Sequence, residues 1–348
     1  MSYKNRSSYR NWRKMLPLIF IFILLGTIQL YNCSKNSGDG SENKAMLTEN
    51  IDEIDEAEKD YLRMPHSLNV VYKTAPIDNG KAKLQMDIYY PTNQKYDKSP
   101  LVVGFHGGGW IAGDRSQIMY IYAPVISELL ANGYTVATVQ YRYANNSFFF
   151  PSPLEDCIDA ILYLKKNSRK YNIDTESIGV MGYSAGAQLA MLSSYAMKEF
   201  STTGETVDIK YCISSAGPSK MYGNEHKSYT KSTRHLLENL FNGKYAAKVE
   251  TYKKGSPYFY LDSIENPDAD KTPKVPLLLI QDTTDDVVPF EQSQVMFDKA
   301  AEIGMPCELI VLSGVGHNID FVFGYMVSPT NEEAVGMILD FIYKYSGK

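Results

Sequence analysis

The sequence predicts an α/β fold with a doubly wound, mostly parallel β-sheet covered by helices, and three observations support this. Short apolar runs of strand length alternate with longer stretches in which apolar residues recur at helical spacing. The first two strand-like runs follow each other directly, without a helix between them. A polar stretch, 217–272, interrupts the alternation late in the chain. Alternation of strands and helices favours parallel pairing, because the helices serve as crossover connections.

The expected strands are rich in β-branched and aromatic residues. The first two are separated by the turn Asp78-Asn79-Gly80, whose residues favour a hairpin. A run such as 101–105 is continuously apolar, as expected for a strand that is buried on both faces. The expected strands are 68–75, 82–90, 101–105, 134–140, 177–181, 211–215, 275–280 and 307–312.

The expected helices lie between these strands. Gly133 ends one of them, because glycine is common just past a helix terminus, and Pro153 opens another, because proline is tolerated in the first helical turn. Residues 217–272 show neither helical nor strand periodicity. We therefore expect an irregular insertion above the carboxyl ends of the strands, where ligands bind in sheets of this type. The expected helices are 118–132, 154–171, 185–197, 291–303 and 331–345.

Residues 1–33 have the layout of an export signal. Basic residues and no acidic ones occupy positions 1–14, and the apolar run that follows, from Met15 to Gly26, is short for a membrane span. Cys33 and the polar tether after it resemble a bacterial lipoprotein signal, in which Cys33 becomes the lipidated first residue. A plain signal peptide and an uncleaved anchor are the alternatives. All three predict an exported protein, either lipid-anchored in the bacterial cell envelope or periplasmic or secreted.

Two further regions follow this signal. We expect residues 34–64 to be a polar and acidic linker that includes a short surface helix at 49–63. Residues 65–348 are expected to form the globular domain.

The composition argues against several classes of function. The formal net charge is −5, and no cluster of Lys and Arg favours a nucleic-acid partner. The four cysteines show no CxxC spacing, and no HExxH motif is present, so we expect neither a metal nor a cofactor. Three cysteines lie in apolar runs and are expected to be buried free thiols, with one disulfide as the alternative. The 27 tyrosines indicate either ordinary structural use or an aromatic-lined groove for sugar or aryl groups.

The run from Gly182 to Gly186 reads Gly-Tyr-Ser-Ala-Gly and lies between an expected strand and an expected helix. A sharp turn at such a junction exposes the central hydroxyl, and it requires small neighbours because the backbone is strained and closely packed. The amino end of the following helix adds positive potential. The pattern therefore predicts Ser184 as a nucleophile.

The run His106-Gly107-Gly108-Gly109-Trp110 follows the strand 101–105. Consecutive glycines let backbone N–H groups point into a cavity, where two such donors can hold the oxyanion of a tetrahedral intermediate. A phosphate-binding loop would need GxxxxGK[ST], or GxGxxG at the start of a helix, and neither is present. We expect His106 to orient the loop through a hydrogen bond rather than to act as a base.

Two later loops supply an acid and a base. The loop after strand 275–280 contains Asp282, Asp285 and Asp286, and each of the three could orient a histidine. His317 follows strand 307–312 and is the candidate base. The chain order serine, acid, histidine is one of the known orders of an acyl-transfer triad.

Together these four motifs resemble the α/β-hydrolase superfamily, and within it the branch of hormone-sensitive-lipase-like and carbohydrate-esterase-like enzymes. Gly113-Asp114-Arg115, Tyr141-Arg142, and Pro153 ahead of Asp156 belong to the same resemblance, which covers about residues 68–346. It implies that residues 65–348 are a catalytic domain of the α/β-hydrolase fold, with an insertion above the sheet.

By resemblance, the triad is Ser184, Asp285 and His317. Asp285 is preferred to Asp282 because it keeps the family's spacing to Val288-Pro289, although Gln281 and Asp282 stand where the family usually has His-Gly.

The resemblance also implies the oxyanion-hole donors. They are the backbone N–H groups of Gly108, Gly109 and Ala185, and in some relatives Trp110 replaces one of them.

The resemblance implies a serine esterase that acts on a small-molecule or oligosaccharide ester. We hypothesise that it removes acetyl or aryl groups from plant polysaccharide fragments, and we expect membrane contact only through the lipid anchor at Cys33. A prolyl-peptidase-like serine peptidase and an inactive surface carbohydrate-binding lipoprotein are the alternatives. Specificity is expected to reside in 142–153 and 217–272, where Phe148-Phe149-Phe150 either walls the acyl pocket or packs in the core.

Overall fold

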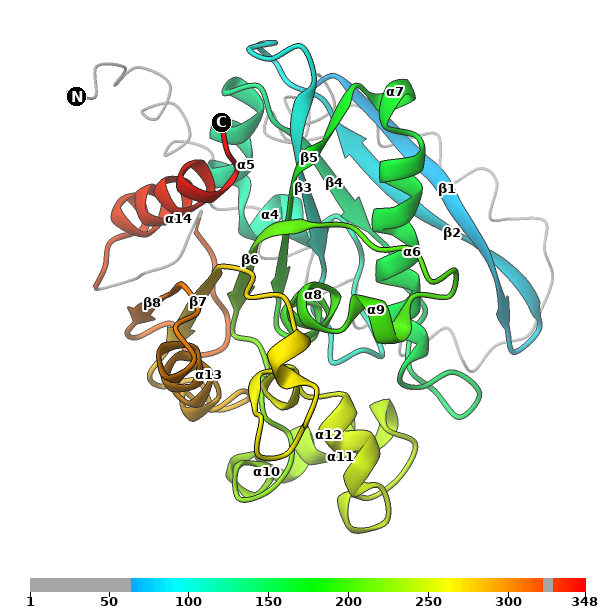
Figure 1. The fold of residues 1–348 in the computed structure, drawn as a ribbon, viewed down its shortest axis with the longest axis vertical. Helices are drawn as coiled ribbons and strands as arrows, with labels where there is room; N and C mark the ends of the chain where they lie inside the picture. The colour runs from blue at the N-terminus through cyan, green and yellow to red at the C-terminus, as the bar shows by residue number, and fades with distance from the viewer. Residues whose placement is uncertain (1–63, 322–327) are drawn as a thin grey trace, which may run out of the picture. The chain divides into compact units, whose positions relative to one another are not determined.

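One sheet organises the part of the chain that the computed structural model describes, residues 64–321 and 328–348 (Figure 1). The β1–β2 and β2–β4 pairs are antiparallel, and every other neighbouring pair is parallel. The predicted α/β class with a mostly parallel sheet is therefore confirmed. In sheet order the strands are β1 (His66–Ile77), β2 (Gly80–Tyr89), β4 (Thr135–Val139), β3 (Ser99–Phe105), β5 (Ile173–Tyr183), β6 (Ile209–Ser215), β7 (Leu277–Asp282) and β8 (Cys307–Leu312).

Helices cover both faces of this sheet, and Figure 1 shows α5 and α14 on one side and α6 and α8 on the other. Every residue of β3, β4 and β7 is consequently buried, which explains their continuous apolar character. The helices outside the insertion are α4 (Gln117–Ile121), α5 (Ala123–Ala131), α6 (Ser152–Lys166), α7 (Ser168–Tyr171), α8 (Ala185–Tyr195), α9 (Met197–Phe200), α13 (Glu291–Glu302) and α14 (Asn331–Tyr345).

Three of the expected helices are each divided in two. The helix expected at 118–132 breaks at Tyr122, because Pro124 has no N–H to donate to a preceding carbonyl and is tolerated only in the first turn of a helix, here that of α5. The helix expected at 154–171 breaks at Asn167, whose side chain donates to the carbonyl of Tyr163 at 2.8 Å and so competes with the helix backbone. The helix expected at 185–197 ends at Tyr195, and α9 follows it.

The prediction that residues 217–272 are irregular is wrong for much of their length. They form α10 (Glu225–Ser228), α11 (Lys231–Leu240), α12 (Val249–Lys254) and the short 3₁₀ segments η2 (Tyr245–Ala247), η3 (Pro257–Leu261) and η4 (Ala269–Lys271). Thr230 caps α11, because its hydroxyl accepts a hydrogen bond from the backbone N–H of Thr233. Figure 1 shows α10, α11 and α12 beyond the end of the sheet at which α8 begins.

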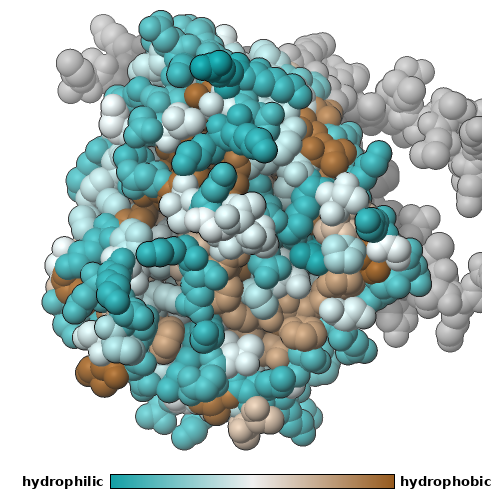
Figure 2. All heavy atoms as spheres, turned by 45° about the vertical axis from the view of Figure 1, so that its right-hand side comes forward, coloured by the Kyte–Doolittle hydropathy of each residue, from teal (hydrophilic) through white to brown (hydrophobic). Residues whose placement is uncertain are grey.

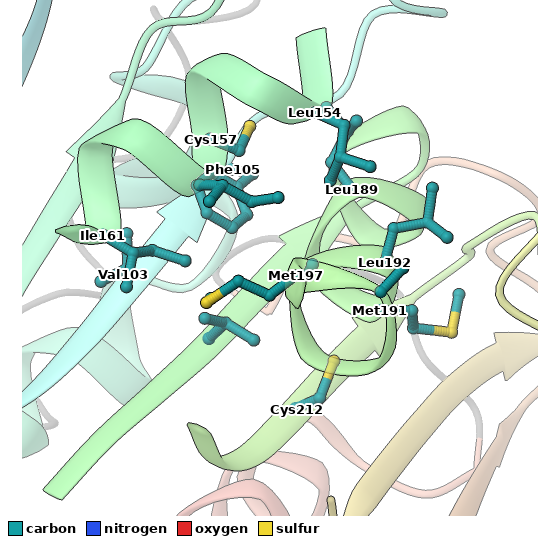
Figure 3. Packing of buried hydrophobic residues seen from close by; sticks show 14 of the residues in the cluster. Val103, Phe105, Leu154, Cys157, Ile161, Leu189, Met191, Leu192, Met197 and Cys212 are labelled. Carbon is teal, nitrogen blue, oxygen red and sulfur yellow. The ribbon is translucent and has the colours of Figure 1, made fainter. Parts of the chain in front are cut away.

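Buried apolar residues lie on both sides of the sheet, and one cluster of them fills the space between the sheet and the helices on its α6–α8 side. Figure 3 shows Phe105 of β3, Cys157 of α6 and Leu189 of α8 in one cluster with Cys212 of β6, and all four are 0% exposed. Cys157, Cys212 and the half-buried Cys307 are free thiols. Burial raises the pKa of Cys212 to about 12, so this thiol stays protonated and unreactive at neutral pH.

Residues Pro65–Lys348 form one compact unit. Figure 2 shows that polar side chains cover most of one face of it, with apolar side chains in separate groups. The described residues include no helix that is both long enough and apolar enough to span a membrane. The predicted export signal at 1–33 with Cys33, and the predicted helix at 49–63, lie outside the described residues.

Candidate active site

Ser184 occupies the turn between β5 and α8. Its backbone has φ 53° and ψ −119°, a sparsely populated conformation for a residue with a side chain. The N–H of Ser184 donates to the carbonyl of Ser215 at 2.8 Å, which ties the turn to β6. A Cβ atom at Gly182 would lie 2.2 Å from the carbonyl oxygen of Gly186, so the turn can close only with glycine there. Ser184 is thus held at the carboxyl edge of the sheet, as its motif predicts.

His317 lies beside Ser184 and Asp285. Its Nε2 is 3.0 Å from Ser184 Oγ, and its Nδ1 is 2.8 Å from Asp285 Oδ2. Because an ionised carboxylate can only accept, Nδ1 carries the proton and Nε2 presents its lone pair to the serine hydroxyl. This tautomer allows His317 to remove a proton from Ser184. The structure therefore brings the three predicted triad residues together.

Asp285 is fixed by several donors besides His317. Its Oδ1 accepts the backbone N–H groups of Val287 and Val288, both at 2.9 Å. Its Oδ2 accepts a hydrogen bond from the side-chain N–H of Gln281 at 2.8 Å. The side-chain oxygen of Gln281, Oε1, in turn accepts one from the hydroxyl of Ser293 at 3.2 Å. The carboxylate is 0% exposed. Gln281 thus secures the acid at a position where the family usually has histidine, a role that the sequence analysis did not assign.

Asp282 does not contact the histidine ring but holds the loop that carries it. Its Oδ2 accepts the N–H of Val315 at 2.9 Å, and its Oδ1 accepts the N–H and hydroxyl of Thr284 at 2.7 and 2.6 Å. Burial alone would raise the pKa of Asp282, but these hydrogen bonds, together with the N–H of Gly316, hold it below its usual value. The two competing aspartates therefore occupy different places, with Asp285 next to the histidine side chain and Asp282 next to the histidine loop.

Tyr183 fastens the same loop from the other side. Its hydroxyl donates to the backbone carbonyl of His317 at 2.6 Å, and the two rings lie 5.5 Å apart. Its ring also lies against the glycine-rich loop 106–113, because a Cβ atom at Gly107 would be 2.8 Å from Tyr183 Cδ1. The sequence gives no signal for this role beyond the residue's place in the Gly-Tyr-Ser-Ala-Gly run.

The oxyanion loop, residues 106–113, has an unusual backbone. Gly108, Gly109 and Trp110 have φ values of 109°, 59° and 63°. A Cβ atom at Gly108 would lie 2.1 Å from the carbonyl oxygen of Ala112, so this position requires glycine. Within residues 64–321 and 328–348, no protein oxygen accepts from the N–H groups of Gly108, Gly109 or Ala185. The three predicted oxyanion donors are therefore available for a ligand.

Ala185 is brought close to this loop by the packing of α8 against β3. A Cβ atom at Gly186 would lie 2.1 Å from the carbonyl oxygen of Phe105 and 2.4 Å from that of His106. Only glycine allows the first turn of α8 to approach β3 so closely. The free N–H of Ala185 consequently lies at the start of a helix, where the helix dipole also favours negative charge.

His106 supports the oxyanion loop through a ring contact and a hydrogen bond. Its ring stacks on Tyr141 at 4.2 Å with an interplanar angle of 9°, and its Nδ1 donates to the carbonyl of Gly107 at 2.7 Å. Burial lowers the pKa of His106 to about 4, so the ring is neutral at neutral pH. These contacts fit the predicted role in orienting the loop.

Trp110 connects the oxyanion loop to α8 and to the insertion. Its indole Nε1 donates to Gln188 Oε1 at 3.0 Å, and the amide of Gln188 donates to the carbonyl of Gly255 at 2.7 Å. Both side chains are almost fully buried. Gln188 is a supporting residue that the sequence analysis missed, because a glutamine in an otherwise apolar helix has no recognisable spacing.

Arg142 and Asp156, two other residues of the resemblance, form a buried ion pair. The guanidinium of Arg142 contacts both oxygens of Asp156, at 2.8 and 2.9 Å. Phe148 lies 5.2 Å from that guanidinium, whereas Phe150 is 5% exposed and packs in the core. The core-packing interpretation therefore holds for Phe150, and Phe148 and Phe149 stay candidates for a pocket wall.

The sequence model of the BD-FAE family matches residues 86–300, which is more than half of the chain. The protein belongs to the BD-FAE family. The matched region begins in β2 and ends in α13, so it includes the oxyanion loop, the nucleophile turn and Asp285.

Relatives of this BD-FAE chain include named esterases. It is 34% identical to an arylesterase of Saccharolobus solfataricus over 34% of this chain and 36% of that protein. It is 24% identical to esterase LipC of Mycobacterium tuberculosis over 81% of this chain and 66% of that protein. The chain thus spans between 29% and 66% of the length of the first curated relatives that it matches.

The fold of this family member is shared with solved structures. A truncated carbohydrate esterase from gut microbiota superposes with a TM-score of 0.63 at 21% identity, covering 82% of this chain and 97% of that one. The predicted α/β-hydrolase fold is therefore confirmed.

Proposed function

We propose that this protein is a serine carboxylic-ester hydrolase. The observation that carries the proposal is the chain of hydrogen bonds from Ser184 through His317 to Asp285, next to three unoccupied backbone donors. Acyl transfer requires a nucleophilic hydroxyl, a base oriented to take its proton, and donors that stabilise the oxyanion. The relatives named as esterases support the same chemistry.

The proposed reaction proceeds in two halves. His317 Nε2 takes the proton of Ser184 as Oγ attacks the ester carbonyl, and Asp285 stabilises the imidazolium that forms. The oxyanion is held by the N–H groups of Gly108, Gly109 and Ala185. His317 then protonates the departing alcohol, and the same steps with water as the nucleophile release the acid and restore Ser184.

The proposed nucleophile can be tested with a fluorophosphonate probe, which phosphonylates activated serines. We expect the purified protein to be labelled and Ser184→Ala to remain unlabelled. Absence of label on the wild-type chain, or persistence of label on Ser184→Ala, would refute the catalytic proposal.

For the substrate, we propose acetyl or aryl esters on plant polysaccharide fragments. The support is the fold shared with a protein named as a carbohydrate esterase of gut microbiota, and the aromatic content of the chain. Acetate release from acetylated xylan is the direct measurement. Release of acetate supports this substrate class, whereas cleavage of p-nitrophenyl acetate without any release from xylan would leave a general esterase.

We also propose that the enzyme is exported and anchored through a lipid on Cys33. The basic and apolar segment before Cys33 and the polar tether after it support this proposal. Radiolabelled palmitate fed to expressing bacteria should appear on the wild-type protein and be absent from Cys33→Ala. Equal labelling of both proteins, or labelling of neither, would contradict the anchor.

A further inference from the structure

α11 of the insertion touches three separate parts of the candidate site. Thr233 Oγ1 donates to the carbonyl of Val287, in the loop that carries the acid, at 3.0 Å. The carbonyl of Leu240 accepts the N–H of Phe150, in the loop 142–153, at 2.7 Å. Leu236 lies between these two points in the sequence. Positions 233, 236 and 240 share one face of a helix, because they are three and four residues apart.

Leu236 contacts the oxyanion loop itself. A Cβ atom placed on Gly109 would lie 2.9 Å from Leu236 Cδ1 and 3.1 Å from Cδ2, so these two methyl groups are packed against the Gly109 backbone. Of the three leucines in α11, Leu237 and Leu240 are 0% exposed, whereas Leu236 is only partly buried. Leu236 therefore packs on the edge of the core and against the oxyanion loop, and part of its apolar surface stays exposed.

This position determines what Leu236 can meet when an ester binds. The carbonyl oxygen of the substrate must lie about 3 Å from the N–H groups that stabilise it. The groups attached to that carbonyl carbon then extend only one or two bonds beyond the donors. Methyl groups in contact with Gly109 consequently border the space that one of these substituents occupies.

We infer that Leu236 is a specificity-determining residue that limits the size of one ester substituent at the oxyanion loop. This inference rests on the proposed function, since it assigns the oxyanion to the loop that Leu236 contacts. The hydrogen bonds of the Thr233 hydroxyl and the Leu240 carbonyl hold α11 on either side of Leu236. The Leu236 side chain, called the wall below, is therefore supported by a fixed helix.

Two substitutions of opposite sign test the inference. Leu236→Ala should favour larger esters and Leu236→Phe should disfavour them, when kcat/KM is measured for p-nitrophenyl acetate, butyrate and hexanoate. A second series of acetyl esters with increasingly large alcohols examines the other substituent. The ratio of large to small substrate in one series should rise on the order of tenfold for Leu236→Ala, because a methylene in an apolar pocket changes discrimination by about that factor.

Leu237→Ala is the matched control, because it removes the same atoms from the same helix at a core position. It should lower stability but keep the wild-type substrate ratio. The inference is overturned if neither series responds to the Leu236 variants, or if Leu237→Ala shifts the ratio as much as Leu236→Ala does.

The proposed function is scored separately in the same samples. Fluorophosphonate labelling of Ser184 and hydrolysis of p-nitrophenyl acetate report on the triad, whatever the substrate ratio. If the Leu236 variants are labelled and active but keep the wild-type ratio of large to small substrate, only the role of Leu236 is refuted. An unlabelled wild-type protein would instead refute the esterase proposal, and the wall with it.

Discussion

The loops at the strand ends and α11 border the same site, but they are held in different ways. Asp285 alone accepts four hydrogen bonds, from two backbone N–H groups, Gln281 and His317, and its side chain is 0% exposed. α11 contacts the site through one hydroxyl, one carbonyl and the partly buried Leu236, while residues such as His235 face solvent.

This difference separates the two tasks of the site. A buried hydrogen-bond network tolerates little change, because each lost partner leaves a polar group unsatisfied. An apolar wall on a surface helix can change size with a smaller effect on the rest of the fold. We therefore expect the strand-end loops to determine whether the reaction occurs, and α11 to determine which ester reacts.

The largest expected effect separates the two aspartates. Asp285→Asn should lower kcat by roughly 10³- to 10⁴-fold, because the amide neither fixes the required tautomer of His317 nor stabilises the imidazolium. Asp282→Asn should lower it only about tenfold, because it loosens the N–H contacts of Val315 and Gly316 without touching the ring. Steady-state kinetics on p-nitrophenyl acetate measures both. Comparable losses in the two variants would contradict the assignment of Asp285 as the acid.

A second strand-end prediction concerns the oxyanion loop. Gly108→Ala should reduce kcat/KM by about 10²- to 10³-fold, because the new methyl group collides with the Ala112 carbonyl and displaces a donor. Gly80→Ala is a matched control. Gly80 has φ 116°, close to the 109° of Gly108, but nothing lies within 4 Å of its Cβ position. Gly80→Ala should cost stability and leave activity intact; an equal loss of activity would trace the effect to backbone strain.

The buried imidazole of His106 predicts how the stability of the oxyanion loop depends on pH. Burial lowers the pKa of His106 from 6.5 to about 4. Between these two pH values the imidazole is protonated in the unfolded chain but neutral in the folded chain. The resulting stability is fully present above about pH 6.5 and is lost as the pH falls towards 4. At about 1.4 kcal/mol per pKa unit, the loss amounts to roughly 3 kcal/mol.

The measurement is the free energy of unfolding of the wild-type protein and of His106→Asn between pH 7 and pH 4. Asparagine does not titrate in this range and can still donate to the Gly107 carbonyl. The difference between the two proteins should shrink as the pH falls. A constant difference would mean that His106 does not hold its loop in the neutral form.

The sequence predicted the strand-end region well because its constraints are local. Ser184, the glycines of the oxyanion loop and His317 each follow a strand, and backbone geometry restricts which residues can stand there. The break at Tyr122 was missed, although its cause is local, since Pro124 is incompatible with the interior of a helix.

The insertion was predicted poorly because its helices depend on distant partners. α11 has a hydroxyl cap at Thr230, but Leu237 and Leu240 pack in the core, Leu236 packs against the loop after β3, and hydrogen bonds tie the helix to the loops that follow β4 and β7. Gln188 and Tyr183 were missed for the same reason. Their roles come from hydrogen bonds to Gly255 and to His317, at separations of 67 and 134 residues, which no local pattern encodes.

Tyr183 gives the smallest effect that we expect to be measurable. Tyr183→Phe removes the hydroxyl that donates to the His317 carbonyl, while the N–H of Ile319 still donates to the same oxygen at 3.0 Å. A net hydrogen bond contributes about 0.5–1.5 kcal/mol, so kcat should fall roughly two- to tenfold.

Burial raises the pKa of Tyr183 well above its usual value, and the hydroxyl therefore stays protonated throughout the working range. The decrease in kcat should accordingly be the same from pH 6 to pH 9, and the shape of the pH–rate profile should not change. If Tyr183→Phe instead removes a limb of that profile, the hydroxyl takes part in proton transfer and is more than a support for the histidine loop.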